Sequence, residues 1–229
     1  MAQGRGRWPW GLLLMVSGLV LLGLLFHAQD EHLLGSPAHA GVGGPHAFLQ
    51  HQPGDPADPV AWDPCREIHY EINPDGGPDD AAGFVAEAIT EVQQISGLQL
   101  HYDGTTDRRP DESGEASALS RAPVLIAWAD EDEVPSLTGD VVGVGGAAAL
   151  RFGSWWRYTT GGVTLDTDLG EDLDSGEAHA VLLHELGHLV GLDHVSDPSQ
   201  LMFSETTFQD DYGPGDREGL IVLGEGRCG

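Results

Sequence analysis

The sequence predicts an α+β domain behind an apolar N-terminal segment, and three observations support this fold class. Stretches in which apolar and polar side chains alternate, as they do in β-strands, recur between residues 66 and 167. Two longer stretches carry apolar residues at helical spacing, and a shorter one lies near the C-terminus. A chain of 229 residues has room for one such domain with accessory segments.

The first strand and the first helix begin the part of the chain that is expected to be ordered. In "DPCREIHYEIN" three apolar residues alternate with polar ones, and "NPDGGPDD" supplies a turn. Apolar residues then recur at helical spacing over 81–95, and Gly97 is placed to end this helix. Further strands are expected at "LQLHYDG", "APVLIAWAD" and "GGVTLDT", with another near 147–152 in the glycine-rich stretch 131–156.

The second long helix is predicted over 175–190. Asp174 and Glu177 form an Asp version of the capping box that begins a helix. Gly191 suits the left-handed position that commonly follows a helix. After an irregular segment, a last short helix is expected near 216–223.

The N-terminal segment has the composition of a membrane anchor or a signal sequence. Residues 8–26 carry no charge, and their number is close to the roughly 20 that a spanning helix needs. Because Arg5 and Arg7 precede them, residues 1–7 are expected on the cytoplasmic side of a single-pass anchor. A cleaved secretory signal is the alternative. The rest of the chain is therefore expected to be extracellular, anchored in the cell membrane or secreted.

The exported part divides into a linker and a domain. Residues 27–61 are rich in Gly, Pro, His and Ala without periodicity, which predicts a flexible linker. Residues 62–229 contain the predicted helices and strands. Acidic residues number 37 and basic residues 10, for a net charge of −27, which argues against nucleic acid as a partner. A monomer is expected.

Two cysteines, Cys65 and Cys228, bracket the predicted domain. In an exported protein such a pair predicts a disulfide bond, and two free thiols are the alternative.

The stretch "HELGHLVGLDH" has the spacing of a zinc site. His184 and His188 are one helical turn apart, so both imidazoles can reach one ion. His194 could not reach that ion from the same helix, but Gly191 permits a sharp reversal that would bring it back. Three ligands leave one position open, as in a catalytic zinc site, and Glu185 lies on the same helix beside the first ligand.

This stretch resembles the extended zinc signature of the metzincin metallopeptidases. Met202, eight residues after His194, resembles the methionine of the turn that these enzymes place below the zinc. "PCREIHYEIN", "ISGLQLHYDG", "GGVTLDTDL" and "DYGPGDREGLIVLG" resemble the matrixin branch, so the resemblance covers about 63–229. It implies a metzincin-like zincin fold with a twisted, mostly parallel sheet, two long helices and a small C-terminal subdomain ending in a helix.

The resemblance implies a zinc-dependent metalloendopeptidase, of EC 3.4.24 type, that hydrolyses extracellular proteins or peptides. His184, His188 and His194 would hold one catalytic zinc ion, Glu185 would be the general base, and Met202 would be a packed platform. Calcium is a further candidate cofactor whose site cannot be assigned. The acidic residues around 166–174 are better explained as a solvated loop.

Some residues depart from the family patterns and leave alternatives open. Val195 stands where matrixins usually have Ser, and no cysteine precedes Cys65 to provide the latency segment of matrixins. An exported zinc-binding interaction module without turnover is the rival function, although it would not need Glu185. A lesser alternative takes Glu205 as the third ligand instead of His194.

Overall fold

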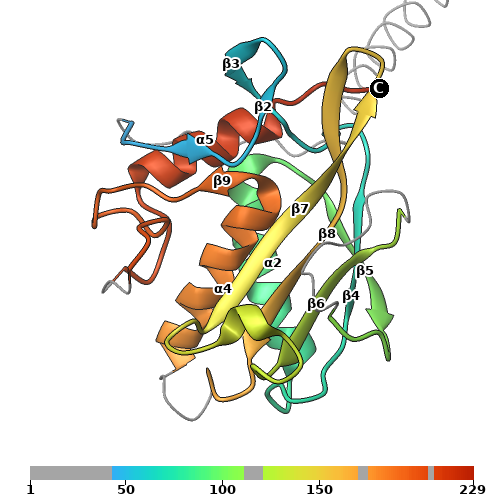
Figure 1. Ribbon diagram of the computed structural model, residues 1–229, viewed down its shortest axis with the longest axis vertical. Coiled ribbons are helices and arrows are strands. Elements are labelled where there is room, and N and C mark those ends of the chain that lie inside the picture. The colour runs from blue at the N-terminus through green and yellow to red at the C-terminus, as the bar shows by residue number, and fades with distance from the viewer. Residues whose placement is uncertain (1–42, 111–120, 170–174, 206–208) are drawn as a thin grey trace, which may run out of the picture. The chain divides into compact units, whose positions relative to one another are not determined.

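A computed structural model describes residues 43–110, 121–169, 175–205 and 209–229. Its centre is a five-stranded sheet in the order β5-β4-β6-β8-β7 (Figure 1). The first four strands pair in parallel, and β7 alone runs antiparallel to its neighbour β8. These strands are β4 (Ile68–Ile72), β5 (Leu100–Thr105), β6 (Val124–Ala129), β7 (Gly143–Phe152) and β8 (Trp155–Asp166).

Two long helices pack beside each other against this sheet (Figure 1). They are α2 (Ala81–Ser96) and α4 (Ser175–Val190), and a shorter helix α5 (Pro214–Gly224) contacts both. The Asp80 carboxylate accepts a hydrogen bond from the Gly83 N–H at the start of α2, and Gly97 ends the helix with a φ of 77°. The α+β class and the mostly parallel sheet are thereby confirmed.

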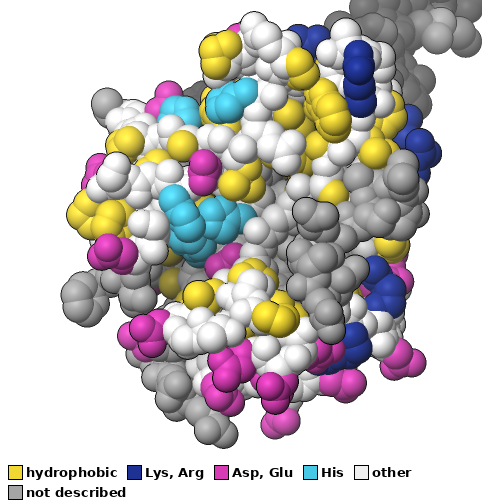
Figure 2. Space-filling view, in the orientation of Figure 1, with side chains coloured by type: hydrophobic (Ala, Val, Ile, Leu, Met, Phe, Trp, Pro, Cys, Tyr) yellow, Lys and Arg dark blue, Asp and Glu magenta, His cyan; other side chains and the backbone are white. Residues whose placement is uncertain are grey.

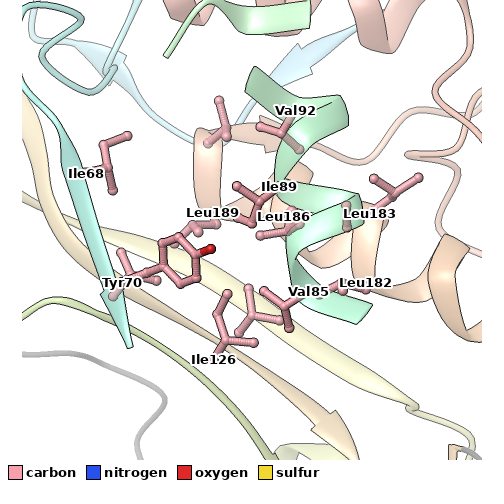
Figure 3. Packing of buried hydrophobic residues seen from close by; sticks show 14 of the residues in the cluster. Ile68, Tyr70, Val85, Ile89, Val92, Ile126, Leu182, Leu183, Leu186 and Leu189 are labelled. Carbon is pink, nitrogen blue, oxygen red and sulfur yellow. The ribbon is translucent and has the colours of Figure 1, made fainter. Parts of the chain in front are cut away.

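The core lies between the two long helices and the sheet (Figure 3). Val85 of α2, Leu186 of α4 and Ile126 of β6 are fully buried, and Ile89 and Tyr70 pack with them. The buried leucines of α4 fix the rotation of that helix. Successive residues of a helix are about 100° apart around its axis. His184 and His188, each two positions after a buried leucine, therefore project from the side of α4 opposite to Leu182 and Leu186.

The chain before β4 also forms strands, although the sequence predicts a linker over 27–61. β1 (Ala47–Phe48) pairs antiparallel with β9 (Leu192–Asp193), and β2 (His51–Gln52) pairs with β3 (Asp55–Pro59). The partner of β1 lies far along the chain, so local periodicity could not reveal the pairing. This part of the chain ends in a buried segment, 60–63.

The two ends of the domain meet at a disulfide bond between Cys65 and Cys228, whose Cα atoms are 5.4 Å apart. The buried Arg157 side chain donates to the Asp63 carboxylate and to the carbonyl oxygen of Gly229 nearby. The C-terminus is thus held against the start of the domain by the disulfide bond and by polar contacts through Arg157.

The predicted membrane anchor requires a correction. Within the described ranges no helix is both long enough and apolar enough to cross a bilayer. The longest helices there, α2 and α4, have 16 residues each, fewer than the roughly 20 required. Residues 8–26 lie outside the described part of the chain. The transmembrane assignment and the cell-membrane localisation derived from it are therefore withdrawn.

Candidate metal centre

Three histidine side chains converge where α4 ends and the chain turns back. Nε2 of His194 lies 3.1 Å from Nε2 of His184 and 3.1 Å from Nε2 of His188. One ligand atom from each ring lies within 4.8 Å of the other two. Figure 2 shows histidine side chains gathered at the surface on one face of the molecule. The side chain of His194 is exposed.

The turn after α4 is what brings the third histidine back. Gly191 has a φ of 126°, a conformation that strongly favours glycine, and its N–H donates to the Gly187 carbonyl at 3.0 Å. β9 follows at once, and its pairing with β1 fixes the direction of the chain into His194. The structure therefore brings together the three histidines that the sequence predicts as zinc ligands.

The other ring nitrogens of the two helical histidines are held by backbone carbonyls. Nδ1 of His184 donates to the Leu201 carbonyl at 2.7 Å, and Nδ1 of His188 donates to the Leu192 carbonyl at 2.8 Å. A carbonyl can only accept, so the proton of each neutral ring sits on Nδ1 and leaves an Nε2 lone pair. Both rings are thus fixed in the tautomer that binds a metal through Nε2.

This donor set fits a zinc ion. Nitrogen ligands at about 2.0–2.1 Å in a tetrahedral arrangement lie about 3.3 Å from one another, close to the observed 3.1 Å. Burial lowers the pKa of His184 to about 4, assisted by the neighbouring His188, and burial also lowers the pKa of His188. Both imidazoles therefore favour the neutral form that a metal requires.

Glu185 lies beside this group, between α4 and strand β7. Its side chain is buried, and burial raises the pKa of the carboxyl to about 8. Gly143 and Gly145 of β7 make the close packing feasible. A Cβ at Gly143 would lie 2.9 Å from Cγ of Glu185, and a Cβ at Gly145 would lie 2.3 Å from the backbone carbonyl oxygen of Glu185. The glycines of this stretch thus let the strand approach the carboxylate.

Met202 is fully packed against Gly187, which lies between the two helical histidines. It has an exposed fraction of 1%, and its carbonyl oxygen accepts a hydrogen bond from the Val195 N–H at 2.9 Å. The preceding residue, Leu201, supplies the carbonyl that orients His184. The segment around Met202 therefore supports both the first ligand and the chain just after the third.

Two residues that support this segment were not identified from the sequence. The buried Asp216 carboxylate accepts from the N–H of Leu201 at 2.6 Å and of Gly213 at 2.9 Å. Gln200 accepts from the Gly215 N–H at 2.7 Å through its Oε1. Both link the Met202 segment to the start of α5. Asp216 lies inside "DYGPGDREGLIVLG", one of the segments that resemble matrixins, but no sequence pattern marked either residue as a support of this segment.

The match to a family model agrees with this geometry. The family model described as Matrixin matches residues 69–214, more than half of the chain, and this range includes the three histidines, Glu185 and Met202. No curated protein matches the sequence. Among solved structures, the chain is similar to archaemetzincin from Methanopyrus kandleri, with 15% identity, a TM-score of 0.43, and coverage of 69% of this chain and 94% of that one. The chain belongs to the matrixin family and is a zinc metallopeptidase.

Proposed function

We propose that this protein is an endopeptidase that hydrolyses peptide bonds in proteins or peptides, with one zinc ion held by His184, His188 and His194. The observation that carries the proposal is the convergence of three Nε2 atoms next to a buried glutamate. Three protein ligands leave room for a water molecule and a substrate, as in catalytic zinc sites.

Glu185 acts as the general base in this proposal. Zinc, when bound, supplies a Lewis acid that polarises a carbonyl group and acidifies water. Burial favours the neutral carboxyl group, but the positive charge of a zinc ion held beside it would favour the ionised form. In that form Glu185 takes the proton from the attacking water and delivers it to the leaving amine. Its backbone belongs to the same helix as His184 and His188, so the carboxylate is held at a fixed place relative to both rings. The buried leucines of α4 prevent that helix from rotating.

Strand β7 offers a place for the substrate backbone. It is the edge strand of the described sheet next to α4, so its outer backbone groups can pair with an extended peptide. Gly143 and Gly145 bring this edge against Glu185. A peptide aligned along β7 would thus pass beside the carboxylate and the three histidines.

The test is Glu185→Gln, which keeps the shape of the side chain and removes its ability to accept a proton. We expect zinc content to stay at one ion per chain at the histidine triad, and cleavage of a mixed peptide library to fall by at least the roughly 10²–10⁴-fold typical of general-base catalysis. Glu177→Gln, in the first turn of the same helix, is the matched control and should leave both unchanged.

Two outcomes would contradict the proposal. A Glu185→Gln protein with more than about a tenth of the wild-type rate, far above the loss expected for a general base, would show that another group activates the water. A zinc-loaded wild-type protein that cleaves no member of the library would favour the rival function, a zinc-binding interaction module without turnover.

A further inference from the structure

A second group of metal-ligating side chains lies on strands β4 and β5. His69 of β4 and His101 of β5 are directly opposite each other in the parallel pairing, and their ring centroids are 5.2 Å apart. Nδ1 of His69 lies 2.8 Å from Oδ1 of Asp103, and Nε2 of His101 lies 3.8 Å from the same oxygen. One ligand atom from each of the three residues lies within 4.8 Å of the other two.

The strand geometry explains why these three side chains meet. Asp103 is two residues after His101, so both project from the same face of β5. The pairing of β4 with β5 shifts at this point, because Tyr70 opposes Tyr102 whereas Glu71 opposes Gly104. Gly104 has a φ of 115°, which permits this irregularity. Asp103 therefore has no opposite residue on β4 in this pairing, and its carboxylate contacts the ring of His69.

The group is open to solvent. The side chains of His69, His101 and Asp103 are 48%, 55% and 29% exposed, so an ion could arrive directly and water could complete its coordination. Glu71, two residues after His69 on β4, is paired with Arg108 at 2.8 Å. The two histidines and Asp103 thus form a self-contained set of ligands.

The chemistry of this set selects a class of metal. Two imidazole nitrogens and one carboxylate oxygen suit zinc and its neighbours nickel, copper and cobalt, whereas calcium and magnesium prefer oxygen ligands alone. The two distances to the shared oxygen, 2.8 and 3.8 Å, lie on either side of the roughly 3.3 Å that ligands about 2.0–2.1 Å from a tetrahedral ion would have. Small side-chain rotations would therefore suffice.

We propose that His69, His101 and Asp103 form a second site for a divalent transition metal of the zinc class, separate from the histidine triad of α4. β5 forms one edge of the sheet, and β7, which contacts α4, forms the other. The two edges are four strand spacings apart, or about 19 Å at about 4.8 Å each. The ion would join the edge strand β5 to β4, and so hold the irregular pairing in register. It takes no part in the reaction at Glu185.

The experiment measures zinc bound per chain on the full-length protein by equilibrium dialysis and isothermal titration. We expect two ions on the wild-type protein, with the second more weakly held, and loss of that second ion in His69→Ala/His101→Ala. His51→Ala removes an exposed histidine outside the group and should keep both ions. His188→Ala/His194→Ala should lose the α4 ion and retain the second.

Activity and thermal unfolding separate this site from the catalytic one. His69→Ala/His101→Ala should cleave peptides at the wild-type rate but lose the increase in Tm that added zinc gives through the second site, since an ion that binds only the folded protein stabilises it. A wild-type protein that binds one ion only would overturn the proposal. A second ion that survives His69→Ala/His101→Ala would overturn it as well.

Discussion

Gly187 packs directly against Met202, and a Cβ added at residue 187 would lie 2.6 Å from the Met202 sulfur. The contact joins the helix that carries two histidines to the segment around Met202. Met202 is buried, so its side chain has little room to move away. The glycine between the two helical ligands is therefore a packing requirement as well as a part of the motif.

Gly187→Ala is expected to destabilise the protein, although alanine is favoured over glycine in a helix by about 1 kcal/mol. Overpacking of a core usually costs about 1–3 kcal/mol, which outweighs that gain. The free energy of unfolding should be measured for Gly187→Ala, for Met202→Ala and for the double variant. The double variant should lose less than the sum of the two single losses, because the shortened side chain makes room for the methyl group. Additive losses would contradict the contact.

His194→Ala tests the third ligand. Removing this ring leaves two nitrogens on α4, so we expect loss of zinc from this site and loss of peptide cleavage. Chelation of the wild-type protein should abolish cleavage too, and zinc should restore it. Retained activity in His194→Ala would favour Glu205 as third ligand, although among the described residues it does not belong to the group around His184.

Asp216 should give the stability of the protein a characteristic pH dependence. Burial raises its pKa, although the backbone N–H groups that it accepts, first that of Gly213, oppose the shift. The folded protein thus holds this proton up to a higher pH than the unfolded chain does. The contribution is fully present below the ordinary Asp pKa of about 3.9 and is lost as the pH rises through the folded pKa.

The measurement compares wild-type protein with Asp216→Asn, whose side chain does not titrate. The difference in unfolding free energy, wild type minus variant, should fall as the pH rises across this window, by at most about 1.4 kcal/mol per pH unit for one proton. A difference that stays flat or rises with pH would contradict the assignment.

Reduction of the Cys65–Cys228 disulfide should lower the melting temperature. The bond closes a loop with a sequence separation of 163, worth about 5 kcal/mol in the chain-entropy model. Cys65→Ala/Cys228→Ala should melt like the reduced wild-type protein and should not respond to reductant. Two titratable thiols in the folded, unreduced protein would show that the bond does not form.

The sequence predicted the parts of the fold that local patterns encode. Capping residues and helical spacing located both long helices, and the second runs over 175–190 as expected. The ligand geometry was also predictable, because His184 and His188 share a helix and Gly191 permits the turn to His194. Each of these inferences depends on residues close together in the sequence.

Features that depend on distant contacts were missed. For β7 the sequence predicted only the second half, near 147–152, because the first half has no clear apolar period and its glycines pack against Glu185. Asp216 is polar and buried, and its partners are backbone groups that no side-chain pattern marks. His69 and His101 match no ligand spacing in the sequence, and only the pairing of β4 with β5 places them opposite each other.

The pairing of β1 with β9 bears on how the protein folds. Residues near the start of the described chain hold the turn that leads to His194, and α5, near its end, contacts both β9 and α4. Contacts between such distant segments form late, because long loops must close first. We therefore expect a nascent chain that lacks α5 to present the two helical histidines without a fixed third one. Tight binding of zinc would then occur at the end of folding rather than at its beginning.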